Sequence, residues 1–221
     1  MGNVGRGLTL AALLTGLVTG CGADDTGSDA ASGASAKASA KTSGKVAKRG
    51  GSVGATGSAC ELPVSFDIAE FWKAEAVDTT EATAAGGDLA EFADLFARQG
   101  PVTMACEIDA KPAGKIGFLR VWTGKPGDAD ARSVLEAFVA AEPEASGAKY
   151  STVEAGGLTG TEVEYVTTSK VMEESKTEHA LAVTTSAGPV VLHLGGLDTD
   201  EHDAMLPAYE LAKSTLRATA A

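Results

Sequence analysis

Residues 22–59 hold almost none of the side chains that a folded core needs. The segment consists nearly entirely of Gly, Ala, Ser, Thr, Lys and Asp, it has no aromatic residue, and Val46 and Val53 are its only larger apolar groups. Such a stretch cannot bury enough apolar surface to offset the conformational entropy that ordering removes. We therefore expect residues 21–59 to form a flexible linker. The fold must then be built from residues 60–221, a length typical of one domain.

The residues before this linker have the organisation of a bacterial lipoprotein signal peptide. Arg6 supplies a basic start, residues 8–18 an apolar core, and Thr19 and Gly20 the small residues before a cleavage site. The order Leu17-Val18-Thr19-Gly20-Cys21 resembles a lipobox and predicts cleavage after residue 20 and diacylation of Cys21. Two acyl chains are enough for stable anchoring, which places the protein on the outer face of the cell membrane.

Two other interpretations of residues 1–21 compete with a lipoprotein signal peptide. The segment can be an ordinary secretory leader that happens to contain a cysteine, or an uncleaved membrane-spanning helix. The second needs about 20 apolar residues, and this run ends too early for that.

The expected domain is strongly acidic. Residues 60–221 contain 27 of the 30 acidic and 12 of the 18 basic residues of the chain, which gives a net charge of −15. Such a field repels nucleic acid and anionic membrane surfaces, so nucleic acid is excluded as a partner, and it favours a cationic partner. The alternative is that acidic side chains only keep an exported protein soluble.

With Cys21 used for lipidation, Cys60 and Cys106 remain. An even pair in an exported domain predicts a disulfide bond. A nucleophilic or metal-binding cysteine is the rival interpretation, but neither residue has partner residues at a suitable spacing.

Apolar periodicity predicts strands and helices in an order typical of a mixed fold. Strands are expected at 62–67, 71–77, 102–109, 115–122, 160–168, 177–185 and 190–194, and helices at 88–96, 128–139 and 205–216. Phe66, Phe71 and Trp72 are the expected core anchors of the first two strands. Because hairpins rather than single strands alternate with the helices, we expect an α+β fold, an antiparallel sheet flanked by helices.

Several short motifs in this order resemble a known family. They are Cys106-Glu107-Ile108-Asp109 and Gly117-Phe118-Leu119-Arg120-Val121-Trp122 in the first hairpin, and the closing Ser214-Thr215-Leu216-Arg217. Residues 60–218 resemble the PsbP-like domain of actinobacterial lipoproteins. The resemblance implies an α/β sandwich and a binding or accessory role, and it brings no shared catalytic residues.

A search for chemistry finds no Gly-x-Ser-x-Gly elbow, no phosphate-binding loop and no His-Glu-x-x-His pair in the sequence. Of the three histidines, His179 and His193 fall within predicted strands and His202 lies near the last helix. Structural imidazoles with satisfied hydrogen bonds are the expected outcome for the two in strands.

The cluster Asp198-Thr199-Asp200-Glu201-His202-Asp203 is a weak candidate for Ca²⁺, with Asp198, Asp200 and Asp203 as oxygen ligands. The cluster departs from an EF-hand loop, because it lacks the Gly and the closing Glu. The competing interpretation places acidic residues at the N-terminal end of the last helix, where the helix dipole favours them. No metal and no cofactor are therefore predicted.

These observations predict an exported, membrane-anchored lipoprotein that is not an enzyme and acts as a binding or accessory module of the cell envelope. Its expected partners are the membrane, through the lipid anchor, and an envelope protein. The alternatives are an envelope hydrolase with an unrecognised site and a Ca²⁺-dependent interaction module.

Overall fold

The computed structural model describes residues 45–78, 87–88, 97–171 and 173–219. The predicted leader, Cys21 and nearly all of the helix predicted at 88–96 lie outside these residues. The elements are strands β1 (Arg49–Val53), β2 (Val64–Ala69), β3 (Lys73–Ala76), β4 (Arg98–Gln99), β5 (Val102–Asp109) and β6 (Gly117–Thr123), helix α3 (Ala131–Ala140), strands β7 (Ala145–Ala155), β8 (Leu158–Ser169), β9 (Glu174–Thr185) and β10 (Gly188–Gly196), helix α4 (Thr199–Thr215) and strand β11 (Arg217–Ala218), with a 3-10 turn at Lys111–Ala113.

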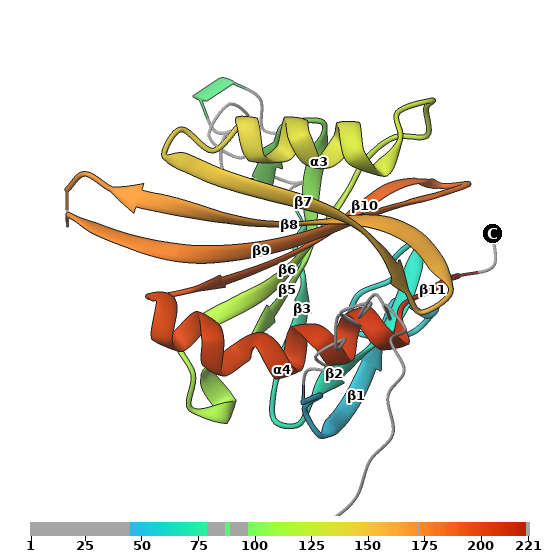
Figure 1. Cartoon of the computed structure of the whole chain (residues 1–221). Helices are drawn as coiled ribbons and strands as arrows, with labels where there is room; N and C mark the ends of the chain where they lie inside the picture. The colour runs from blue at the N-terminus through green and yellow to red at the C-terminus, as the bar shows by residue number, and fades with distance from the viewer. Residues whose placement is uncertain (1–44, 79–86, 89–96, 172, 220–221) are drawn as a thin grey trace, which may run out of the picture. The chain divides into compact units, whose positions relative to one another are not determined.

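One large antiparallel sheet forms the centre of the domain. Its strand order is β3-β5-β6-β10-β9-β8-β7, and β4 pairs with β5 at one side. Figure 1 shows α3 on one face of this sheet and α4 on the other, with the small sheet β1-β2-β11 beside α4. The predicted antiparallel sheet flanked by helices is confirmed.

The central strands have two buried faces. On β9, Ala180 and Ala182 pack with the residues under α3, whereas Leu181 and Val183 pack with those under α4. Successive residues of a strand point to opposite faces, so this continuous apolar run supplies both cores. Small alanines on one face and larger residues on the other give the two helices different packing surfaces.

Strand β1 corrects the predicted boundary of the linker. Residues 49–53 pair with β2, and the side chain of Val53 is buried in the core. Backbone hydrogen bonds hold β1, so it does not need many apolar side chains. Glycine suits this contact, because a Cβ on Gly50 would lie 2.5 Å from the Cα of Glu70. The domain therefore begins before residue 60.

Two predicted details also differ. Phe66 is buried and Trp72 packs against the core, but Phe71 is exposed and has a φ of 69°, so the strand expected at 71–77 begins only at Lys73. Helix α4 begins at Thr199, earlier than expected, and continues through Pro207. Strand β7 had no counterpart in the prediction.

None of the helices within the described ranges is both long enough and apolar enough to cross a membrane.

Candidate functional site

A cavity of about 940 Å³ lies on the α3 face of the large sheet. No residue of α3 lines it, but Glu142 and Glu144, which follow the end of that helix, do. Most of the remaining wall comes from strands β5, β6, β8, β9 and β10, and Gln99 of β4 together with Ile116, Leu197 and Asp198 beside the strand ends complete it. Its size is within the range of about 300–1,000 Å³ that is usual for small-molecule sites.

A buried polar cluster forms one part of the cavity wall. Nε2 of His193 lies 3.1 Å from Oε2 of Glu178 and 3.1 Å from the hydroxyl of Tyr165. The ammonium group of Lys176 lies 2.8 Å from Oε1 of Glu178 and donates to the carbonyl oxygen of Gly196 at 3.0 Å. Glu178 is only 3% exposed. A charge this deeply buried needs such partners.

The ionisation of Glu178 follows from these contacts. Burial by itself disfavours the carboxylate, but the hydrogen bond from His193 and the charge of Lys176 outweigh burial, so the pKa of Glu178 lies below its ordinary value. An ionised carboxylate accepts hydrogen bonds and cannot donate them. Nε2 of His193 therefore carries the proton of this hydrogen bond.

A second ion pair crosses the neighbouring strands. Nε of Arg120 on β6 donates to Oε2 of Glu107 on β5 at 2.8 Å, and the guanidinium lies 4.7 Å from the centre of the Phe118 ring. Arg120 is also the register partner of His193 on β10. Residues paired across a sheet share a face, so Glu107, Arg120 and His193 form one row along the cavity.

Buried polar atoms without a hydrogen-bond partner gather at this cavity. The described residues contain five such side-chain atoms, and three of them belong to residues that line the cavity: Nε1 of Trp122, Oγ1 of Thr167 and Nδ1 of His193. The other two belong to α4. Unpaired buried polar atoms are rare in folded proteins and mark places that need an explanation.

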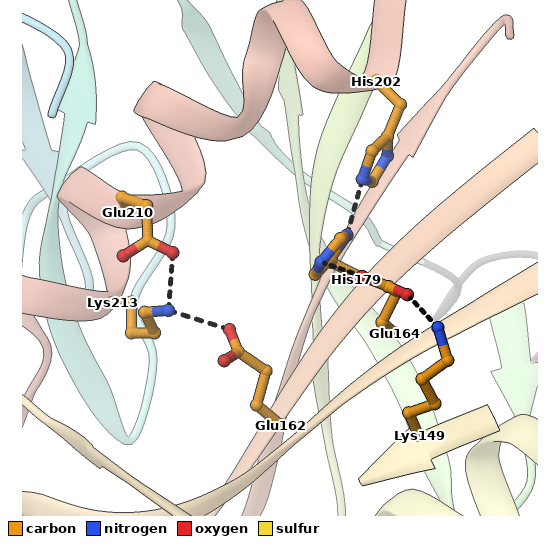
Figure 2. A network of polar contacts seen from close by, with 7 residues as sticks. All are labelled: Lys149, Glu162, Glu164, His179, His202, Glu210 and Lys213. Atoms are coloured by element: carbon orange, nitrogen blue, oxygen red, sulfur yellow. Dashed lines mark hydrogen bonds and ion pairs between the residues drawn. The ribbon is translucent and has the colours of Figure 1, made fainter. Parts of the chain in front are cut away.

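A different polar network lies on the α4 face (Figure 2). Nδ1 of His179 on β9 lies 2.7 Å from Nε2 of His202 on α4, and Nε2 of His179 lies 3.7 Å from Glu164 on β8. Lys149 continues this row by donating to Glu164 at 2.9 Å. These residues span three adjacent strands and the helix, and they connect α4 to the sheet.

The same network has a second branch. Nζ of Lys213 donates to Glu162 at 2.9 Å and to Glu210 at 2.6 Å, as Figure 2 shows. Its side chain is only 16% exposed. The branch therefore joins the C-terminal half of α4 to β8.

The two stacked imidazoles of this network are poor bases. Burial, and next the neighbouring His179, lower the pKa of His202 to about 4, and burial also lowers the pKa of His179. A hydrogen bond between two imidazole nitrogens needs one N–H and one lone pair, so the pair cannot be fully protonated. The prediction of a structural role fits His179, whereas His193 belongs to the cavity wall.

The other predicted site residues have varied outcomes. The disulfide between Cys60 and Cys106 is present and links the segment before β2 to β5. Asp198 is the N-cap of α4, and its carboxylate accepts from the backbone N–H of Glu201 at 2.8 Å. Asp200 and Asp203 lie within α4. Within the described ranges, no group of three or more His, Cys, Asp and Glu residues is placed to hold a metal ion.

Sequence reasoning did not single out Glu107, Arg120, Lys176 or Glu178 as site residues. One signal was present, because Glu107, Arg120 and Glu178 are charged residues within largely apolar strands. Charged residues in such positions are seldom buried without a partner.

Three comparisons with known proteins gave three different kinds of result. A family described as uncharacterised lipoprotein matches residues 30–216. A search of curated proteins found no significant match. Among solved structures, the chain is similar to the solution structure of cyanobacterial PsbP (CyanoP) from Synechocystis sp. PCC 6803, with 14% identity and a TM-score of 0.47, over 76% of this chain and 98% of that one.

Proposed function

The chain belongs to a family of uncharacterised lipoproteins, and from that premise we propose that it is an exported binding module of the cell envelope. In this proposal, a lipid on Cys21 holds it at the outer face of the cell membrane. The basic start, the apolar core and the small residues before Cys21 support this anchor. The residues between Cys21 and β1 then act as a tether.

The ligand site of the proposed module is the cavity on the α3 face. The observation that carries this assignment is the coincidence of a cavity of about 940 Å³ with buried, unpaired polar atoms on Trp122, Thr167 and His193. These atoms lie just behind the cavity surface, and the residues that carry them form part of its wall. Concave sites with a mainly apolar wall and a few convergent polar groups are typical of small-molecule binding.

Binding fits the geometry better than catalysis does. In a nucleophile–histidine–carboxylate triad, one ring nitrogen contacts the nucleophile and the other contacts the carboxylate. Here Tyr165 and Glu178 both lie against the same nitrogen, Nε2 of His193. Tyr165 is also buried, and burial together with the nearby Glu178 raises its pKa far above the ordinary value, which makes its hydroxyl a poor nucleophile.

Membrane fractionation tests the anchor. We expect the protein to incorporate labelled palmitate and to remain in the membrane fraction, and we expect Cys21→Ala to abolish both. The double variant Cys60→Ala/Cys106→Ala is the matched control, because it removes two cysteines that are not expected to carry lipid. Equal labelling of the Cys21→Ala variant would reject the anchor.

Mass spectrometry of the protein purified from its native envelope tests the cavity. We expect a small molecule to be released on denaturation of the wild type and to be absent from Thr167→Trp, because Thr167 lines the cavity on the same face as Tyr165 and an indole there takes up part of its volume. The control is Ser151→Trp, at an exposed position of β7. A molecule released in equal amounts from both variants contradicts the assignment.

A further inference from the structure

We propose that the cavity on the α3 face selects a small organic cation with an apolar body, of the alkylammonium type, over anionic and neutral molecules. This inference rests on the proposed function, because it assigns a ligand class to the same cavity. Four features of the cavity carry it: the charges that line it, their pairing, the nearby helix end and its apolar surface.

The charges that line the cavity are mostly negative. Its wall contains six Asp or Glu side chains but only two Lys or Arg side chains. Both cations are already matched by a carboxylate, Arg120 by Glu107 at 2.8 Å and Lys176 by Glu178 at 2.8 Å. Among the described residues of the wall, every Lys or Arg side chain therefore already has a carboxylate partner, which leaves none to pair with an entering anion.

The remaining carboxylates are not equivalent. Asp198 caps α4, and Glu144 pairs with Lys170 at 2.9 Å. Glu142 and Glu174 line the cavity and have no ion pair within the described part of the chain. These two side chains leave the cavity with uncompensated negative charge, and a bound cation compensates it.

The end of α3 adds to this negative potential. The C-terminal end of a helix carries about half a negative charge, and the last turn of α3 contains no basic residue. Glu142 and Glu144 follow directly after this end and line the cavity. A cation at this point interacts with the helix dipole and with the adjacent carboxylates.

The cavity also offers apolar surface for the body of such a ligand. Met104, Phe118 and Trp122 contribute to its wall, and Ile116 and Leu197, both more than half exposed, lie beside one another through a backbone hydrogen bond of 3.0 Å. The guanidinium of Arg120 already lies over the Phe118 ring, so these side chains supply apolar contact rather than a free face for a second cation. The wall can therefore contact the alkyl chain of the ligand, while the carboxylates contact its ammonium group.

Three probes with the same alkyl chain and different charge test this proposal: octylammonium, octanol and octanoate. Each is titrated into the full-length protein in lipid nanodiscs, with empty nanodiscs as the blank. Trp72→Phe leaves Trp122 as the only tryptophan, so the emission reports at the cavity wall. We expect octylammonium to bind with a Kd about tenfold below that of octanol, and octanoate to bind about tenfold more weakly than octanol.

Charge-neutral variants then identify the groups responsible. We expect Glu142→Gln/Glu174→Gln to raise the Kd for octylammonium about tenfold and to change that for octanol by less than about twofold. The control Glu61→Gln/Glu154→Gln makes the same change in net charge outside the cavity wall and is expected to leave both constants unchanged.

The outcomes separate this inference from the proposed function. Equal binding of octanol and octylammonium, or tighter binding of octanoate, overturns the selection of cations but keeps the cavity as a ligand site. A response to none of the three probes overturns the inference. If, in addition, mass spectrometry detects no molecule released from the denatured wild type, the assignment of the cavity as a ligand site is also overturned.

Discussion

Helices α3 and α4 cover opposite faces of the same sheet but differ in length, with 10 and 17 residues. At 1.5 Å per residue they span about 15 Å and about 25 Å. Strands β8 and β9 each have 12 residues, so they extend for about 40 Å. Figure 1 shows the two helices on opposite faces of the sheet. The residues Glu142 and Glu144, which follow the end of the shorter helix, line the cavity, so the cavity lies beyond the end of α3.

The two faces also treat buried histidines differently. On the α4 face, His179 and His202 hydrogen-bond to each other beneath the helix (Figure 2). On the α3 face, His193 lies in the wall of a cavity beside Glu178 and Lys176. A buried histidine therefore has a structural role where a helix lies over it, and it can form part of a ligand site where no helix does. Four predictions test this division.

The largest expected effect concerns the disulfide, which belongs to the core on the α4 side. Removal of a link across a sequence separation of 46 is expected to lower the free energy of unfolding by about 4 kcal/mol, because the unfolded chain gains entropy. Denaturant unfolding of Cys60→Ala/Cys106→Ala measures this loss. Below the melting temperature, the response of Trp122 to octylammonium is expected to persist, since the cavity is on the other face.

The outcome also tests whether the faces are independent. A loss of the octylammonium response in the folded variant would show that the α4 side controls the cavity. Cys21→Ala is the control for cysteine removal, and we expect it to leave the free energy of unfolding unchanged.

The second effect is a loss of stability in acid on the α4 face. The pKa of His202 is lowered to about 4 in the folded protein, against about 6.5 in the unfolded chain. The unfolded chain therefore binds more protons between these values, and stability falls as the pH decreases through this window. The expected loss is about 2 kcal/mol by pH 5 and about 3 kcal/mol near pH 4.

Unfolding measurements between pH 7 and pH 5 check this prediction. The variant His202→Gln keeps a polar group near His179 but does not titrate, so its stability is expected to depend less on pH. Wild type and variant with the same pH profile would show that the histidine pair does not control acid stability.

The third effect concerns Lys213, which is 16% exposed and contacts Glu162 and Glu210. The variant Lys213→Met keeps the alkyl stem but leaves two carboxylates without their shared cation, and it is expected to destabilise the protein by about 2 kcal/mol. The control Lys149→Met removes an ion pair from a side chain that is 78% exposed, at an expected cost of about 0–1 kcal/mol. Thermal and denaturant unfolding measure both variants. An equal loss of stability in Lys213→Met and Lys149→Met would contradict the importance of burial.

Sequence patterns predicted the fold where side chains carry the signal. Strands β5, β6 and β9 were found because apolar or β-branched residues recur along them. Strand β7 was missed because Ala155 is its only buried residue, and β1 was missed because its glycines pair through the backbone. Neither strand has the apolar periodicity on which such predictions depend.

The candidate site was harder to predict than the fold. The disulfide followed from a count of cysteines, but the row of Glu107, Arg120 and His193 depends on the register of three strands. A shift by one residue would turn each side chain to the other face, and a single sequence does not fix that register. The length of α3 relative to the sheet, which leaves the cavity open, is equally a property of the assembled fold.

The smallest expected effect compares two threonines. Thr167 lines the cavity, and its Oγ1 has no partner among the described residues. We therefore expect Thr167→Val to change stability by less than about 0.5 kcal/mol, because no hydrogen bond is lost. Oγ1 of Thr215, at the end of α4, accepts from the backbone N–H of Asp67 at 2.9 Å and donates to the carbonyl of Leu211 at 2.7 Å. Thr215→Val leaves a partly buried N–H unpaired and is expected to cost about 1–2 kcal/mol. If denaturant unfolding shows that Thr167→Val costs as much stability as Thr215→Val, the Thr167 hydroxyl has a structural partner. The difference between a packed α4 face and an open α3 face then does not hold at Thr167.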